Sequence, residues 1–257
     1  MAADPIPKAF DHVALWVSDP DAVADALVRG LDLRVIERTD TFTLVGVDAR
    51  LGKVTLFAGE GPRERGALER VVLRVSDVPS ALARMPPELS VVEASEHEAR
   101  LEGPEGLGLG LVRAAPGQSP SDLDHVVLRV ADPERAASRL TALGFSRRDG
   151  ELVVGDRYLR LVAGGARGGD AGEAGGAGAP GGAGEAGGEG AGERPLLNHL
   201  ALLVDSVDEY LAAVRRRDSE LEIDEIKDAP NTYAAFVWGP DRIKLEYLEH
   251  KPGFSLV

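Results

Sequence analysis

Three of the five histidines stand at matching places in a repeated sequence pattern. His12, His125 and His199 are each the second residue of a segment that begins with Asp or Asn and continues as an apolar run. A histidine that recurs in this way can be inherited scaffold that hydrogen-bonds to nearby backbone, or it can be a metal ligand. Two histidines and one carboxylate hold a metal on one face and leave its other positions open, which suits Fe(II) and oxygen chemistry.

A glutamate in the last apolar segment, IKLEYLEH, could supply the carboxylate. Strand alternation would place Leu245 and Tyr247 on one face and Glu246 on the other. A carboxylate in such a strand is costly to bury unless it is paired or bound to a metal. The alternatives are an ion pair of Glu246 with Lys244 or Arg242, or a solvated position at a sheet edge.

We predict that His125, His199 and Glu246 together form the metal site. His12 has no comparable set around it, because the second segment carries Arg70 where the others carry histidine. One metal site in the C-terminal half and none in the N-terminal half is therefore expected.

The elements that position these residues belong to four copies of one unit. Each copy has a strand-like run, a Ser/Asp-rich break suited to a helix N-cap, an Ala/Leu-rich helical pattern and three short apolar runs. The copies begin with the sequences DHVALWV, ERVVLRV, DHVVLRV and NHLALLV. The pattern predicts four βαβββ modules and an α+β fold.

A Gly/Ala-rich stretch interrupts the repeat between the third and fourth modules. Residues 164–194 contain no aromatic residue, no β-branched residue and no leucine. Such a segment buries too little apolar area to offset its ordering entropy, so we predict a disordered linker there.

One module cannot cover both faces of its own sheet, so modules must pair into curved half-barrels with helices outside. Pairing consecutive modules predicts an N-terminal domain over residues 8–115 and a metal-binding C-terminal domain over residues 120–250. This arrangement resembles the vicinal oxygen chelate superfamily, which includes glyoxalase I, bleomycin-resistance proteins and type I extradiol dioxygenases.

The resemblance implies a specific chemistry. By motif, His125, His199 and Glu246 fall on the ligand positions of extradiol dioxygenases, which cleave catecholic rings with O2. It implies Fe(2+), with Mn(2+), Zn(2+) or Ni(2+) as alternatives. Residues 126–198 lack the acid–base histidine of that family. A glyoxalase-like isomerase or lyase, or a metal-free small-molecule-binding protein, are the alternative functions.

Five further residues are weaker candidates. His250 could replace the missing acid–base group, or it could be a solvated tail residue. A family tyrosine corresponds here to Phe236, and Tyr233 and Trp238 lie nearby as catalytic or substrate-binding candidates. Arg129 could bind a substrate carboxylate or phenolate, or form a salt bridge.

Composition excludes several classes of function. The sequence has 43 acidic and 29 basic residues, a net charge of −14, so a nucleic-acid-binding surface is not expected. No apolar run is long enough to span a membrane, no secretory signal is visible, and there is no cysteine for a thiolate site. We expect a cytoplasmic protein that binds a small aromatic or vicinal-oxygen substrate, with exposed strand edges that would allow a homo-oligomer.

Overall fold

The computed structural model describes residues 5–31, 33–47, 52–60, 63–164 and 194–254. The predicted linker, apart from its two end residues, lies outside the described residues. No helix in the described part is long and apolar enough to cross a membrane.

Each of the four sequence copies folds as a βαβββ module. The first comprises β1 (Ala9–Val17), α1 (Pro20–Leu31), β2 (Arg34–Arg38), β3 (Phe42–Gly46) and β4 (Lys53–Ala58). The second comprises β6 (Leu68–Val75), α2 (Val78–Leu82), β7 (Ser90–Ala94), β8 (Glu98–Glu102), η1 (Pro104–Gly106) and β9 (Gly108–Arg113).

The third and fourth modules follow the same order. The third comprises β10 (Leu123–Val130), α3 (Pro133–Ala142), β11 (Ser146–Arg148), β12 (Glu151–Val154) and β13 (Arg157–Ala163). The fourth comprises β15 (Leu197–Leu203), α4 (Val207–Arg217), β16 (Glu222–Asp228), β17 (Thr232–Trp238), η2 (Pro240–Arg242) and β18 (Lys244–His250). The short strands β5 (Arg63–Glu64) and β14 (Arg194–Pro195) pair with each other.

The modules pair in a different order from the predicted one. One eight-stranded sheet runs β16-β17-β18-β15-β1-β4-β3-β2 and joins the fourth module to the first. The other runs β11-β12-β13-β10-β6-β9-β8-β7 and joins the third to the second. The predicted domains 8–115 and 120–250 are therefore wrong as folding units. Because all four first strands share one pattern, local sequence does not specify which of them pair.

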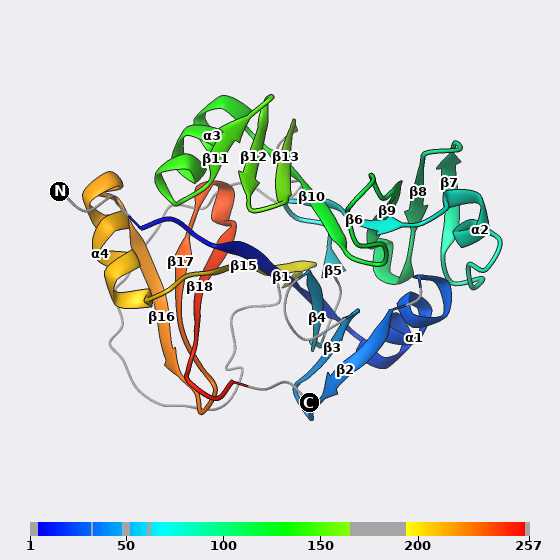
Figure 1. The fold of residues 1–257 in the computed structure, drawn as a ribbon, viewed down its shortest axis with the longest axis horizontal. Coiled ribbons are helices and arrows are strands. Elements are labelled where there is room, and N and C mark those ends of the chain that lie inside the picture. The colour runs from blue at the N-terminus through cyan, green and yellow to red at the C-terminus, as the bar shows by residue number, and fades with distance from the viewer. Residues whose placement is uncertain (1–4, 32, 48–51, 61–62, 165–193, 255–257) are drawn as a thin grey trace.

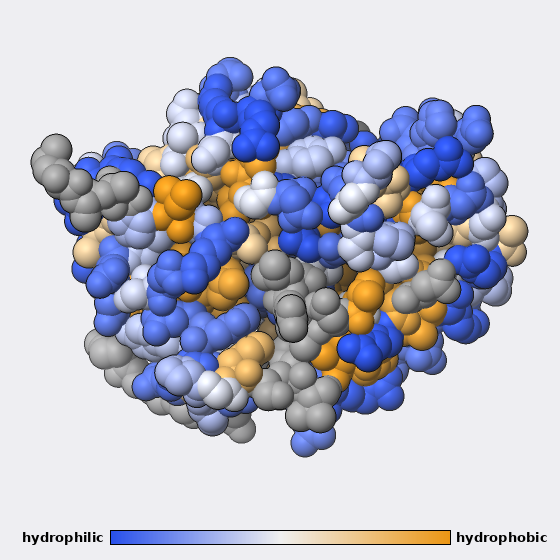
Figure 2. All heavy atoms as spheres, in the orientation of Figure 1, coloured by the Kyte–Doolittle hydropathy of each residue, from blue (hydrophilic) through white to orange (hydrophobic). Residues whose placement is uncertain are grey.

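The two central junctions are antiparallel. Strand β1 lies beside β15 across the middle of the molecule, and β10 lies beside β6 in the other sheet (Figure 1). The helices lie on the outer side of the sheets (Figure 1). Polar residues dominate the face shown in Figure 2, and apolar residues lie mostly in recesses between them.

The core lies between the sheets and their helices, and it links the two sheets. Tyr210 on α4 and Tyr247 on β18 both donate hydrogen bonds to the carbonyl of Leu143, just after α3, over 3.2 and 2.9 Å. Gly144 follows with φ +122°, and a Cβ there would collide with the Tyr210 hydroxyl. A glycine is therefore required at this contact.

The alternation predicted for the last strand is present. Leu245 and Tyr247 are fully buried in the main core. On the opposite face, Leu248 forms a separate apolar cluster with Ala234 and Phe236. Glu246 shares that second face, which is the concave side of the sheet.

Candidate metal centre

Three side chains from different strands of the first sheet converge on one point. The Nε2 atoms of His12 on β1 and His199 on β15 are 3.1 Å apart. Glu246 on β18 places Oε2 3.1 Å from the His199 Nε2 and 3.3 Å from the His12 Nε2. Among the described residues these three form the group of histidine and carboxylate ligands close enough to share a metal ion.

The register of the sheet produces this convergence. Ala201 on β15 is opposite His12 on the antiparallel neighbour β1 and opposite Glu246 on the parallel neighbour β18. His199 precedes Ala201 by two residues and therefore points to the same face. The small side chain of Ala201 leaves the space above it to the three ligands.

Neighbouring polar groups orient both imidazoles. Asp11 Oδ1 is 2.7 Å from His12 Nδ1, and Asn198 Oδ1 is 3.0 Å from His199 Nδ1. Lys53 on β4 donates to the Asp11 carboxylate from 3.0 Å, and both groups are buried. An acceptor on Nδ1 fixes the proton there, so each Nε2 presents its lone pair to the common point.

The charges favour the protonation states that a metal requires. Burial alone would raise the pKa of Glu246, but the His199 and His12 imidazoles outweigh it and hold that pKa below its ordinary value. Burial lowers the pKa of His199 more than Glu246 raises it. An ionised Glu246 carboxylate beside a neutral His199 imidazole is a state that binds a metal.

The residues present fit a divalent metal ion. Glu246 Oε2 is buried and has no hydrogen-bond partner among the residues that the structure describes, although two imidazole nitrogens lie within 3.3 Å of it. Such an atom is expensive to bury without compensation. For metal–ligand distances of about 2.1 Å, adjacent ligand atoms lie about 3.0 Å apart in octahedral sites and about 3.4 Å apart in tetrahedral ones. The observed separations fall in this range.

The symmetry of the two modules identifies a fourth position. Thr55 on β4 is opposite Ala14, which is two residues after His12. In the same way, Glu246 is opposite Ala201, which is two residues after His199. The first module thus provides a threonine where the fourth provides a carboxylate. The site has two histidines and one carboxylate, with no second acid in the equivalent place.

The ligands line a cavity of about 470 Å³ with aromatic walls. The Phe236 ring meets the His199 ring edge-on at 5.2 Å, and the Phe57 ring lies 6.1 Å from it. Lys227 and Asn231 also line the cavity, along with His250. The His250 ring stacks on Phe254 at 3.8 Å, and its Nε2 is 4.0 Å from Asp11 Oδ2.

The prediction that His125 is the first ligand is wrong. His125 lies on β10 in the other sheet, where Nδ1 is 2.7 Å from Asp124 and the ring stacks on Tyr158. The structure brings His199 and Glu246 together with His12 instead, because module one is the partner of module four. The signal for His12 was in the sequence, as the recurring histidine position, but module pairing was needed to use it.

Three of the weaker candidates lie outside this cavity. Tyr233 points to the helix side of the sheet and donates to Asp208 on α4 over 3.1 Å. Trp238 is held by a hydrogen bond to Asp224 and by two cations, and it does not line the cavity. Arg129 is on β10 of the other sheet, in an ion pair with Glu69.

The two remaining candidates, His250 and Phe236, do line the cavity. Their placement leaves them available for proton transfer and for substrate contact, respectively.

Comparison with known proteins gives structural neighbours only. No protein-family profile matches the sequence, and no curated protein matches it. Among solved structures, a variant of glyoxalase I from Zea mays aligns with TM-score 0.70 and 17% identity over 94% of this chain and 93% of that one. A candidate dioxygenase from Bacillus subtilis aligns with TM-score 0.65 and 16% identity over 97% and 87%. The cppA protein from Streptococcus pneumoniae aligns with TM-score 0.60 and 12% identity over 96% and 99%. At these identities the likeness shows a shared fold over nearly the whole chain.

Proposed function

The chain has the fold of the vicinal oxygen chelate superfamily, and on that premise we propose that it is a metal-dependent enzyme acting on a substrate with two adjacent oxygens. The reaction that the site favours is extradiol cleavage of a catecholic ring by O2, with Fe(2+) as the metal. The observation that carries the proposal is the convergence of His12, His199 and Glu246 at an aromatic-lined cavity.

The ligand set is the first support. Two histidines and one carboxylate leave enough open positions for a chelating substrate and for O2. When bound, Fe(2+) would supply electron transfer between the two reactants and hold them together. Thr55 stands where a second carboxylate ligand would be expected for a two-acid site of the glyoxalase type. The isomerase alternative is therefore less favoured.

The cavity walls are the second support. Phe42, Phe57 and Phe236 offer ring faces and edges to a planar aromatic substrate. Lys227 and Asn231 provide polar groups for a substituent on that ring. These side chains would orient the substrate and exclude water from the side facing the ligands.

His250 is the group best placed to move a proton. Burial lowers its pKa below the ordinary histidine value, so the ring is unprotonated at neutral pH and has a free lone pair to accept a proton. It can accept the proton that a catecholic hydroxyl loses on chelation. The stacked Phe254 ring restricts its orientation.

The test is metal content, by elemental analysis of anaerobically purified protein, together with an assay of catechol-dependent O2 consumption. We expect about one iron per chain, loss of that iron in His12→Ala, and retention in His125→Ala. The two substitutions are matched, because both histidines occupy the second residue of a module.

Other results would redirect the proposal. Retained zinc, nickel or manganese with no O2 consumption would favour an isomerase or lyase. Absence of any metal, even after reconstitution, would favour a metal-free binding protein. Iron lost in His125→Ala and kept in His12→Ala would contradict the site itself.

A further inference from the structure

The second sheet repeats the geometry of the metal centre with different side chains. His125 on β10 is opposite Val72, which is two residues after Arg70. In the first sheet, His199 is opposite Ala14, which is two residues after His12, so the antiparallel register is the same. Val127, two residues after His125, is opposite Arg160 on the parallel strand β13. Arg70, His125 and Arg160 therefore occupy the places that His12, His199 and Glu246 occupy in the first sheet.

The fourth place in this sheet carries no side chain. Gly110 on β9 is opposite Val72 and corresponds to Thr55. A Cβ at Gly110 would lie 2.9 Å from a methyl group of Val72, so a larger residue would collide with that side chain. The space is bounded by the arginines and His125.

These side chains line a small cavity of about 100 Å³, in which Arg100 contributes a third guanidinium. At about 30 Å³ per water molecule, this volume suits a ligand of only a few heavy atoms. Two of the three metal ligands of the first sheet are replaced here by arginines, so a metal ion is disfavoured and an anion is favoured.

The donors facing this cavity are largely uncommitted. Within the described residues, the side chain of Arg70 forms no hydrogen bond and no ion pair within 4 Å. Arg160 donates a hydrogen bond from Nε to Glu151 over 2.8 Å, which leaves its two terminal nitrogens to face a ligand. His125 has a side chain only 4% exposed, and its Nε2 has no hydrogen-bond partner in the described part of the chain. Mutual repulsion with Arg100 and Arg160 adds to burial in lowering the pKa of Arg70.

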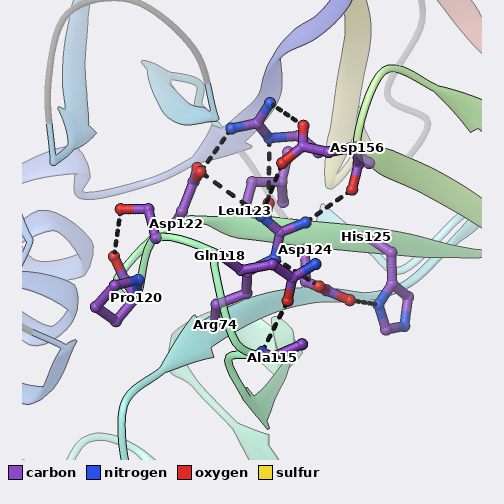
Figure 3. Close-up of polar contacts among 11 residues, drawn as sticks. Arg74, Ala115, Gln118, Pro120, Asp122, Leu123, Asp124, His125 and Asp156 are labelled. Carbon is purple, nitrogen blue, oxygen red and sulfur yellow. Dashed lines mark hydrogen bonds and ion pairs between the residues drawn. The ribbon is translucent and has the colours of Figure 1, made fainter.

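A network of ion pairs and hydrogen bonds holds the His125 ring (Figure 3). Arg74 Nε donates to Asp124 Oδ1 over 2.7 Å, and Asp124 Oδ2 is 2.7 Å from His125 Nδ1. Arg74 is held in turn by Asp156 over 2.9 Å. The arrangement matches that of Lys53, Asp11 and His12 in the first sheet, so it presents Nε2 in a fixed direction.

Two carboxylates compete for these cations. Glu93 and Glu98 also line the cavity, but both are exposed. Glu93 is 3.5 Å from Arg100. Neither forms an ion pair with Arg70 or Arg160 within 4 Å among the described residues.

We propose that this second cavity binds a small oxyanion of the size of inorganic phosphate, held by Arg70, Arg160 and His125. Planar guanidinium groups give forked hydrogen bonds to phosphate oxygens, and two of them approach this cavity from the strands on either side of β10. The modules thus provide a cation site in one sheet and an anion site in the other from the same backbone positions.

The test is calorimetric titration of the whole, chelator-treated chain with inorganic phosphate, at an ionic strength kept constant with sodium chloride. We expect saturable binding of one phosphate per chain that weakens at least tenfold in Arg70→Gln and in Arg160→Gln, about the loss of one charge-assisted hydrogen bond. Arg34→Gln removes the same charge from an exposed position on the other sheet and should leave binding unchanged. His199→Ala, which alters only the first cavity, should also leave it unchanged.

Two further variants keep the test decisive. Glu98→Gln removes a competing carboxylate and should tighten binding. If Arg70→Gln fails to fold, Arg70→Lys retains the charge and should bind phosphate more weakly than the natural chain, because an ammonium lacks the guanidinium fork. Absence of saturable binding, equal loss in Arg34→Gln, or loss in His199→Ala with retention in Arg70→Gln would each overturn the proposal.

Discussion

Glu246 and Arg160 occupy equivalent positions in the two sheets. Glu246 is opposite Ala201, two residues after His199. Arg160 is opposite Val127, two residues after His125. One position carries a carboxylate that completes a metal-ligand group, and the other carries a guanidinium. Because the backbone register is the same, the side chains at these equivalent positions distinguish the two sheets.

Glu246→Gln should abolish stabilisation of the protein by divalent metal. The amide keeps the shape of the side chain but removes the anionic ligand atom, and the two histidines alone hold a metal weakly. A metal at about 100 times its Kd stabilises the natural chain by about 2.7 kcal/mol. Thermal unfolding with and without Mn(2+) measures this difference.

The matched control is Glu225→Gln, at an exposed position on β16. It should keep the full metal-dependent rise in Tm. An equal rise in Glu246→Gln would show that the metal binds elsewhere.

Asp11→Asn should weaken metal binding about 10- to 100-fold without removing a ligand. The carboxylate of Asp11 holds His12 Nδ1 over 2.7 Å and is itself bound by Lys53. An amide can present its nitrogen to the imidazole and favour the wrong tautomer. Competition with a coloured chelator measures the affinity.

Asp124→Asn makes the same change beside His125, the histidine of the second sheet. Metal affinity should be unchanged in this variant. If both substitutions weakened metal binding equally, the effect would be general destabilisation and not orientation of His12.

His250→Gln should lower kcat by about 10²- to 10⁴-fold while metal content stays at the natural level. The pH profile provides a second readout. Because the pKa of His250 lies below its ordinary value of 6.5, mainly through burial, the neutral base persists as the pH falls below 6.5. Activity should be lost only as the pH drops through the lowered pKa.

That acid limb should be absent from the residual activity of His250→Gln. An unchanged kcat, or an acid limb that survives the substitution, would assign proton transfer to another group.

Arg74→Met should destabilise the fold by about 3–5 kcal/mol near neutral pH, because it leaves the buried Asp124 carboxylate without its cation. Burial would raise the pKa of Asp124, but His125 and Arg74 outweigh it and lower that pKa. The stabilisation that the ionised Asp124 carboxylate provides is therefore complete above pH 3.8, the pKa of this carboxyl in the unfolded state. It is lost as the pH falls through the lowered pKa of the folded state.

Urea unfolding at pH 7 and at pH 3 tests both statements. The difference between the natural chain and Arg74→Met should be large at pH 7 and smaller at the acidic pH. Arg113→Met, which removes the partner of the exposed Asp77, should change stability little at either pH. A loss in Arg113→Met as large as that in Arg74→Met would contradict the role of burial.

Sequence pattern alone predicted the local architecture and much of the site. Four βαβββ modules follow from one repeated pattern. The alternation of side chains along a strand places Glu246 on the face opposite to Leu245 and Tyr247. These features depend on backbone geometry within a few residues, which a single segment encodes. The histidine position at the second residue of a module was also visible, and it includes His12.

Only the tertiary structure decided which histidine joins His199 and Glu246. Strands β1 and β10 both contain Asp-His followed by an apolar run, so either could pair with β15 on local grounds. The pairing of β1 with β15 joins residues far apart in the chain, such as His12 with Ala201 and Ala14 with His199. No periodicity within a module records such contacts, because they depend on how completed modules fit together. The same pairing placed Arg70 beside His125 and so separated a cation site from an anion site.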